Sequence, residues 1–280
     1  MTNAASFESL GACIMDQEDI TEYWEANAEA WTRLARAGYD VYRDALNTPA
    51  FLAMLPPVAG LDGLDIGCGE GANTRRLALV GARMQAVDIA PTFIRHARAL
   101  EETSPLGIEF QIGDALALPY ADSSFDFATA FMSLMDVPDS GRALREAQRV
   151  LRPAGFLQFS ILHPCFAPPY RKVRRDADGT VRGIEVGDYF DESDGRIDTW
   201  LFSGVPKEER QRIPPFRVPR FHRTLTSWVR MIGEAGLVIQ QIGEPSATEE
   251  VARAVPDMAD TRVAGIFLHV RAVKPKVAVW

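Results

Sequence analysis

The sequence predicts an α/β fold: a doubly wound, seven-stranded, mostly parallel sheet with helices on both faces and an inserted lid after the fifth strand. Three observations support this prediction. Short apolar segments alternate with helical segments over residues 63–162, a glycine-rich turn follows the first apolar segment, and the alternation stops near residue 163 and resumes near residue 225. Strands separated by helices need crossover connections, and these produce a parallel sheet covered on both faces.

The segment before the sheet is expected to be helical. Residues 19–45 repeat apolar side chains at helical spacing, and Asp19 and Glu22 could form a capping box at the start. Two tryptophans, Trp24 and Trp31, lie on this segment. They either seat the helix on the rest of the protein or contribute to a ligand site, and the sequence leaves both alternatives open. We treat residues 1–55 as an N-terminal helical cap.

The core of the fold is expected over residues 56–162. Its predicted strands and helices alternate in order: a strand at 63–66, a helix at 72–80, strands at 84–87, 108–112, 125–131 and 155–162, and further helices at 91–100 and 141–151.

The alternation breaks over residues 163–224, which contain several prolines and charged patches. A structureless loop of this length is improbable inside a compact domain, so the segment is predicted to be an inserted lid or substrate subdomain. Residues 225–280 then return to the core, with a helix at 225–235 and strands at 237–242 and 263–273.

The most informative motif is LDIGCGEGAN at residues 64–73. A strand that runs into alternating glycines and then a helix lets the backbone turn sharply and approach a ligand, with free helix N–H groups directed at it. Many nucleotide-binding folds share this arrangement. The glycines even satisfy the loose fingerprint of dinucleotide-binding proteins.

Three acidic residues help to distinguish a dinucleotide site from a site for another nucleoside-containing ligand. Asp65 and Glu70 make the turn acidic where NAD would place its pyrophosphate, so the sequence predicts that NAD does not bind, whereas acid beside a sulfonium and an ammonium is attractive. Asp88 follows the second strand, where its carboxylate could accept both hydroxyls of a ribose.

The sequence resembles the class I, Rossmann-like S-adenosylmethionine-dependent methyltransferases. The resemblance covers residues 61–161, through LDIGCGEG, AVDIAP, IGDALALPYADSSFDFATAFMSLMDV and LREAQRVLRPAGFLQFSI, in the family's order and spacing. It implies S-adenosyl-L-methionine as cofactor. The cofactor-binding residues that it implies are Asp65, Gly67, Cys68, Gly69, Asn73, Asp88, Ile89, Asp114, Ala115 and Met132.

In these expected roles, Asp65 helps to hold the methionine end, Asp88 holds the ribose, and Ile89 flanks the adenine. The pair at 114–115 meets the N6 edge of the adenine, and Met132 lines the other side of the cofactor. No thiol chemistry is expected of Cys68, because inside this turn it should offer its backbone.

The methyl acceptor should lie outside the carboxyl ends of the strands, beside residues 133–136 and 163–166. His163 is the candidate catalytic base, because an imidazole titrates near neutrality. His222, near the point where the insertion rejoins the core, is the second candidate. Methyl transfer mainly needs positioning and exclusion of water, so a missing base would not refute the reaction.

The sequence thus predicts transfer of a methyl group from S-adenosylmethionine to an oxygen or nitrogen of a small-molecule metabolite. The alternative is a protein that binds the cofactor without methyl transfer, or an enzyme that uses it for other chemistry. An intact cofactor motif favours binding but does not distinguish these alternatives.

Composition agrees with a small substrate. The net charge of -8 disfavours a nucleic-acid partner, and the short basic run at residues 171–175 is expected to be a solvated surface. No apolar run approaches the roughly twenty residues that span a membrane. The cysteines, Cys13, Cys68 and Cys165, form no CxxC pair. They predict no metal site and a reducing, cytoplasmic location. Neither the oligomeric state nor the acceptor is predicted.

Overall fold

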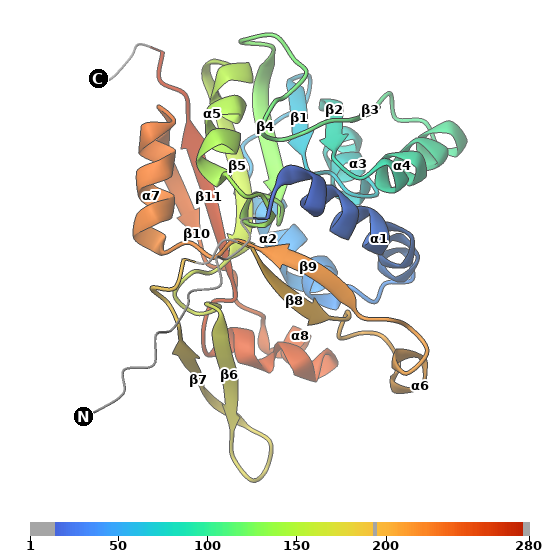
Figure 1. Cartoon of the computed structure of the whole chain (residues 1–280), viewed down its shortest axis with the longest axis vertical. Helices are drawn as coiled ribbons and strands as arrows, with labels where there is room; N and C mark the ends of the chain where they lie inside the picture. The colour runs from blue at the N-terminus through green and yellow to red at the C-terminus, as the bar shows by residue number, and fades with distance from the viewer. Residues whose placement is uncertain (1–14, 193–194, 277–280) are drawn as a thin grey trace, which may run out of the picture.

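A computed structural model describes residues 15–192 and 195–276 of the chain. Its centre is a seven-stranded sheet of order β10-β11-β5-β4-β1-β2-β3 (Figure 1). The strands of this sheet are β1 (Asp62–Ile66), β2 (Arg83–Asp88), β3 (Glu109–Ile112), β4 (Phe125–Phe131), β5 (Leu151–Leu162), β10 (Val238–Gly243) and β11 (Phe267–Val273). The first five pair in parallel, and β11 is antiparallel to both β5 and β10. The predicted α/β class and mostly parallel sheet are confirmed.

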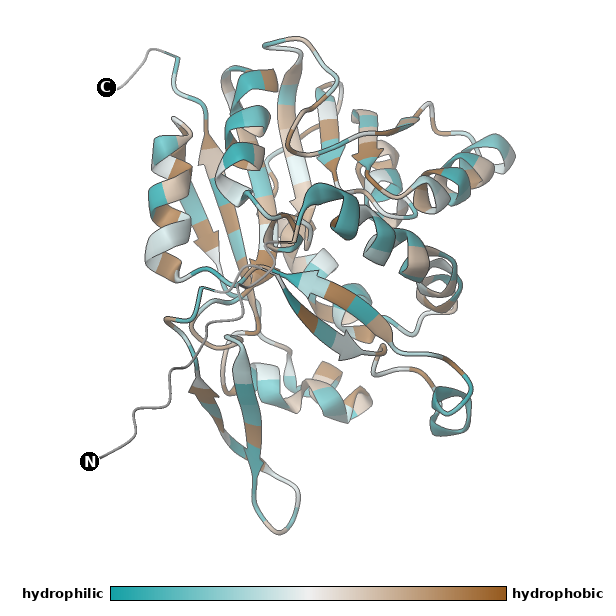
Figure 2. Ribbon diagram, viewed as in Figure 1, coloured by the Kyte–Doolittle hydropathy of each residue, from teal (hydrophilic) through white to brown (hydrophobic). Residues whose placement is uncertain are grey.

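Helices cover both faces of this sheet. α5 (Ser140–Val150) and α7 (Leu225–Glu234) bury apolar side chains against β1, β4 and β5 on one face. On the other face, α3 (Ala72–Leu79) and α4 (Pro91–Thr103) pack on a second buried cluster that includes Phe127 and Phe156. In Figure 2 the apolar residues are concentrated in the central strands, and the outward surfaces of the helices are mostly hydrophilic. The sheet is therefore doubly wound, with a core on each side.

The N-terminal helix α1 (Gln17–Arg36) begins two residues earlier than predicted. Its N-cap is Asp16, whose carboxylate accepts from the backbone of Asp19, and the carboxylate of Asp19 accepts in return from the backbone N–H of Asp16 at 3.1 Å. The predicted capping box between Asp19 and Glu22 was wrong, because Asp19 is the third helical residue rather than the cap.

The same helix is also shorter than the predicted span of 19–45. It ends at Arg36, two residues before Gly38, whose φ of +79° lies in the left-handed region that stops a helix. The chain then continues in the π-helical turn η1 (Arg43–Asn47) and in α2 (Thr48–Met54). The single expected helix is therefore a helix, a bend and a second short helical unit.

The insertion contains two small antiparallel sheets. They are formed by β6 (Tyr170–Arg175) with β7 (Val181–Gly187) and by β8 (Arg196–Trp200) with β9 (Phe216–Arg220), with the short helix α6 (Lys207–Arg210) before β9.

Helix α1 lies along β9 (Figure 1). The side-chain amide of Asn27 donates to the carbonyl oxygen of Arg217 at 2.9 Å and accepts from its backbone N–H at 3.2 Å. The insertion and the N-terminal helix are thus docked to each other over the carboxyl edge of the sheet.

The C-terminal part differs from the prediction in one segment. Residues before 267 form α8 (Glu249–Ala254) and the 3-10 helix η3 (Pro256–Arg262), so the last strand begins four residues later than expected. The predicted domain boundaries at residues 55, 162 and 224 coincide with the ends of elements, and the division into domains stays a prediction. Within the described ranges, no helix is long and apolar enough to cross a membrane.

Candidate functional site

A cavity of about 670 Å³ opens at the carboxyl edge of the parallel strands. Its wall combines the strand ends of the core with α1, with residues 40–43 and with both small sheets of the insertion. Small-molecule sites commonly have volumes of about 300–1,000 Å³. The cavity therefore has the size and the location expected of a ligand site in an open α/β sheet.

The glycine turn forms one end of the cavity. Gly67 has a φ of +71°, and a Cβ there would lie 2.4 Å from the Cβ of Ser133, so only glycine fits. The N–H groups of Gly67 and Cys68 both donate to the carbonyl of Val87, at 2.9 and 3.0 Å, which ties the turn to β2. Gly69 has a φ of +55° and no atom within 4 Å of the position a Cβ would take. Here bare backbone borders the cavity and can approach a ligand closely.

Two buried carboxylates lie beside this turn. Asp65, at 1% exposure, accepts from the hydroxyls of Thr74 at 2.5 Å and Thr129 at 2.9 Å. Burial raises the pKa of Asp65 to about 6, and the two hydroxyls oppose this rise.

Asp88 is the second buried acid. Its two oxygens accept from the backbone N–H groups of Gly69 at 2.8 Å and Ala90 at 3.0 Å, and burial raises its pKa to about 6. No described Lys or Arg nitrogen lies within 4.0 Å of either Asp65 or Asp88. Since both acids lack a cationic partner, this end of the cavity fits a ligand that carries hydroxyls and positive charge.

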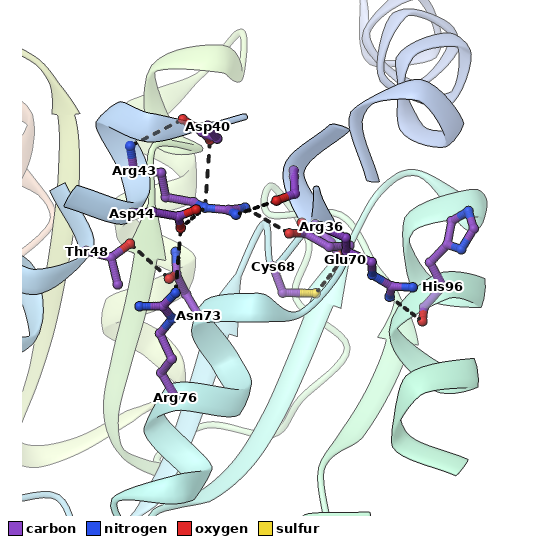
Figure 3. A network of polar contacts seen from close by, with 12 residues as sticks. Arg36, Asp40, Arg43, Asp44, Thr48, Cys68, Glu70, Asn73, Arg76 and His96 are labelled. Carbon is purple, nitrogen blue, oxygen red and sulfur yellow. Dashed lines mark hydrogen bonds and ion pairs between the residues drawn. The ribbon is translucent and has the colours of Figure 1, made fainter. Parts of the chain in front are cut away.

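Glu70 has such a partner, unlike the other two acids of the motif. The guanidinium of Arg43 lies 2.8 Å from Glu70 and 3.0 Å from Asp44, and Figure 3 shows it extending from the N-terminal segment toward the glycine turn. The negative charge that Glu70 brings to the turn is therefore balanced by a cation. The partner lies 27 positions earlier in the chain, where a local motif gives no sign of it.

Most predicted cofactor-binding residues line the cavity. Asn73 lines the cavity, and its side-chain amide oxygen accepts from the hydroxyl of Thr48 at 3.0 Å (Figure 3). The other predicted residues in the wall are Asp65, Gly67, Cys68, Gly69, Asp88, Ile89, Ala115 and Met132. Burial raises the pKa of the Cys68 thiol, which agrees with a packing role for this side chain.

Asp114 is not among the described residues of the wall, although Gly113 and Ala115 on either side of it are. Its carboxylate accepts from the backbone N–H of Leu116 at 2.7 Å and from the side-chain amide of Gln17 at 2.9 Å. Gln17 itself lines the cavity, so the first turn of α1 covers the neighbourhood of Asp114.

The two candidate catalytic histidines lie away from the described wall. The Nε2 atom of His163 is 2.7 Å from Glu244, and its Nδ1 accepts from the backbone N–H of Cys165 at 3.1 Å. His222 directs Nε2 to the carbonyl of Tyr189 at 2.8 Å, and burial lowers its pKa. This geometry does not support either histidine as a base acting in the cavity.

Aromatic side chains form another part of the wall. The ring of Trp31 on α1 contacts those of Trp200 and Phe202 from the insertion, with centroids 5.4 and 4.8 Å apart. Trp24 packs on Phe93 and also lines the cavity. The tryptophans of α1 thus pack the helix on its neighbours and also line the cavity, and a direct role at the cofactor stays a prediction.

The basic run of β6 is partly bound to the body of the protein. Arg171 lines the cavity and pairs with Asp260 at 2.6 Å, so its expected place on a solvated surface was wrong. Arg174 pairs with Glu185 within the insertion. Across the described part of the chain, no group of His, Cys, Asp and Glu could hold a metal ion.

Sequence reasoning gave no individual role to several residues of the wall, namely Gln17, Arg43, Asp136, Asp198 and Arg220. Asp136 lay in the stretch expected beside the acceptor, and Asp198 and Arg220 lay in the predicted lid. The others come from segments whose position depends on long-range packing.

Comparisons with known proteins agree with this geometry. Residues 64–159 match the family described as a methyltransferase domain. The chain is 33% identical over 179 residues to a 27-O-demethylrifamycin SV methyltransferase of Amycolatopsis mediterranei, covering 60% of this chain and 61% of that protein. It is 38% identical over 117 residues to the O-methyltransferase cnsE of Penicillium expansum, covering 40% of this chain and 42% of that protein. The matches therefore span less than two thirds of either relative.

Among solved structures, the chain resembles an S-adenosylmethionine-dependent methyltransferase of Mesorhizobium loti. The TM-score is 0.64 at 28% identity, with 80% of this chain and 96% of that chain covered.

Proposed function

Because the chain belongs to the class I, Rossmann-like S-adenosylmethionine-dependent methyltransferases, we propose that it transfers a methyl group from this cofactor to a hydroxyl oxygen of a small-molecule metabolite. The observation that carries the proposal is a single cavity with two chemically different parts. One is acidic and bordered by bare backbone at Gly69, and the other is walled by aromatic rings.

The acidic part fits the cofactor. S-adenosylmethionine supplies an electrophilic methyl group on a positively charged sulfur, together with an ammonium and a ribose diol. Asp88 would accept the ribose hydroxyls, since each of its oxygens receives only one N–H from the chain. Asp65 would stabilise the positive charge of the methionine part, because it is buried without a cation of its own. The open backbone at Gly69 would let the ligand lie against the turn.

The aromatic part would hold the acceptor. Trp31, Trp200 and Phe202 offer planar apolar surface, which suits a ring-containing metabolite and excludes water around the transferred methyl group. Oxygen is preferred to nitrogen because one of the two relatives reported above is named an O-methyltransferase and the other is named for a 27-O-demethylated compound. Each basic residue of the described wall already pairs with an acid, which also favours an uncharged acceptor over a nucleic acid.

The insertion and α1 would act together as the lid of this cavity. Both contribute to its wall, and they contact each other through Asn27 and Arg217. A lid of this kind excludes water and selects the acceptor.

Calorimetry with S-adenosylmethionine and S-adenosylhomocysteine tests cofactor binding, and a panel of hydroxylated metabolites tests transfer by release of S-adenosylhomocysteine. We expect both cofactor forms to bind and at least one ring-containing alcohol to be methylated. Binding without release across the panel would favour the alternative, a protein that binds the cofactor without methyl transfer.

A further inference from the structure

Among the described residues of the cavity wall, the buried carboxyl group of Asp136 neither pairs with a cation nor belongs to the proposed cofactor site. Asp136 ends the 3-10 turn η2 (Leu134–Asp136), directly after β4, and is 4% exposed. It lines the cavity. Among the described residues, none donates a hydrogen bond to its carboxylate or forms an ion pair with it. Asp65 and Asp88, by contrast, each receive two hydrogen bonds from the chain.

The turn that carries Asp136 is held firmly in place. The backbone N–H of Asp136 donates to the carbonyl oxygen of Ser133 at 3.0 Å. The hydroxyl of Ser140 donates to the carbonyl oxygen of Leu134 at 2.9 Å. The backbone N–H of Phe221 donates to the carbonyl oxygen of Met135 at 2.9 Å. These contacts come from the turn itself, from α5 and from the end of the insertion. A side chain on such a turn is preorganised toward whatever occupies the cavity.

Arg220 and Asp198 of the insertion influence the pKa of Asp136, but neither forms an ion pair with it. Burial raises the pKa of Asp136 well above its usual range, Arg220 opposes the rise, and Asp198 adds to it. Arg220 is already bound, since one of its nitrogens lies 3.2 Å from Asp198 and another donates to the carbonyl of Ala167. Arg220 is thus directed to other groups, and no hydrogen bond or ion pair joins it to Asp136.

A buried carboxylate without a donor is unfavourable unless a ligand supplies the donor. The surrounding wall limits what that ligand can be. Aromatic rings from α1 and β8 favour a planar apolar body, and the Arg220–Asp198 pair already balances its own charge. A neutral O–H group on a ring system satisfies both requirements.

We propose that Asp136 binds the hydroxyl group of the methyl acceptor and takes its proton during transfer, so that the acceptor class is an uncharged aromatic alcohol. This inference rests on the proposed methyl transfer. In the balanced step, the acceptor oxygen loses its proton to Asp136 and forms a bond to the methyl carbon, while the electron pair of the broken carbon–sulfur bond stays on sulfur. The protonated Asp136 then returns its proton to water.

The burial of Asp136 makes its carboxylate better suited to accept a proton. A carboxylate that is harder to keep ionised than usual is also a stronger base, closer in strength to a phenolic hydroxyl than an exposed aspartate is. Neither His163 nor His222 lines the described wall, so Asp136 is the base that the cavity offers near the end of β4.

The experiment compares two probes, 7-hydroxycoumarin and 7-methoxycoumarin, which differ in the single O–H. Their binding is measured by calorimetry on protein saturated with S-adenosylhomocysteine. The variants are Asp136→Leu, which keeps the branched shape but replaces both acceptor oxygens by methyl groups, and Asp136→Asn, which keeps a neutral acceptor at similar volume. Asp122→Asn is the matched control, because this carboxylate is exposed and lies outside the cavity wall.

We expect wild type and Asp122→Asn to prefer the hydroxylated probe by about tenfold, the size of one charge-assisted hydrogen bond. Asp136→Leu should lose this preference and Asp136→Asn should retain only part of it. Affinity for S-adenosylhomocysteine should stay within about twofold in every variant, which also reports that each one is folded.

A wild-type protein that binds the two probes equally, or binds neither, would overturn the inference. So would an Asp136→Leu variant that keeps the preference. Absence of S-adenosylhomocysteine binding would overturn the proposed function and this inference with it. Cofactor binding without a hydroxyl preference would overturn the inference alone.

Discussion

Replacing Asp88 by Asn should weaken cofactor binding while leaving the free protein about as stable as before. The carboxylate accepts from Gly69 and Ala90, but it is 8% exposed and burial raises its pKa from 3.8 to about 6. Its ionised form is therefore disfavoured in the folded protein. The same charge is what the proposed ribose contact needs.

The magnitudes follow from these contacts. A shift from 3.8 to about 6 means that ionised Asp88 destabilises the fold by about 3 kcal/mol relative to its protonated form. Asn removes this cost, but its single carbonyl oxygen serves only one of the two N–H groups, which costs about 1–3 kcal/mol. The two effects nearly cancel near neutral pH. Loss of the charged acceptor should weaken cofactor binding by about 2 kcal/mol, or about 30-fold.

The sign of the pH dependence separates this explanation from a general loss of structure. The folded-state pKa of Asp88 is raised, so its favourable contribution is complete below about pH 4 and is lost as the pH rises through about 6. Wild type should therefore gain roughly 1 kcal/mol over Asp88→Asn between about pH 7.5 and about pH 5.

Urea denaturation at both pH values and calorimetry with S-adenosylhomocysteine measure the two effects. Asp126→Asn is the control, because the neighbouring Arg152 lowers the pKa of Asp126 and overcomes the rise caused by burial, and because Asp126 lies outside the described cavity wall. Its destabilisation should shrink as the pH falls, and its cofactor affinity should not change. If Asp88→Asn binds S-adenosylhomocysteine as tightly as wild type, the ribose assignment is wrong. If the difference in free energy of unfolding between wild type and Asp88→Asn does not vary with pH, burial does not raise the pKa of Asp88 as described.

Four further outcomes are expected. Arg43→Met should destabilise the protein by about 3 kcal/mol in urea denaturation, because it leaves Glu70 buried without its cation, and adding Glu70→Gln should recover most of this loss. Asp136→Asn should raise the melting temperature near neutral pH, since a buried carboxyl without a partner is removed, and an unchanged or lower value would contradict its unpaired state. Hydrogen exchange should slow in residues 19–45 and 164–221 when S-adenosylhomocysteine binds, whereas equal protection with and without ligand would identify a rigid subdomain rather than a lid. Calorimetry should detect no NAD binding, and a low-micromolar dissociation constant would show that the acidic end of the cavity accepts a pyrophosphate.

The glycine turn could be predicted from the sequence because its structure depends on neighbouring residues. Strand β1, the turn and α3 are contiguous, so the backbone shape follows from the order of residues alone. Asp65 and Gly69 line the cavity as expected. Asp88 could be placed as well, since it ends the next strand of a parallel pair and thus reaches the same edge.

The side chains whose partners the sequence did not predict depend on contacts between distant segments. His163 follows β5 at the expected edge. Its ring forms a hydrogen bond with Glu244, 81 positions later, and is not among the described residues that line the cavity. Glu70 is paired with Arg43 in the same way. The sequence correctly predicted which edge of the sheet these residues reach. The orientation of the His163 ring and of the Glu70 carboxylate depends on partners that are distant in the chain, and a local sequence pattern does not identify them.

The contact between Asn27 and Arg217 has a consequence for how this protein could change its acceptor. The side-chain amide of Asn27 recognises only the backbone N–H and carbonyl of residue 217, groups that every amino acid except proline provides. Docking of β9 on α1 through this contact therefore makes almost no demand on the side chains of the strand. Substitution of Val218, a residue of β9 in the described wall, could therefore reshape the acceptor part of the cavity while Asn27 and the packing of Trp31 on Phe216 still hold the strand on the helix. The contiguous cofactor turn would remain as it is.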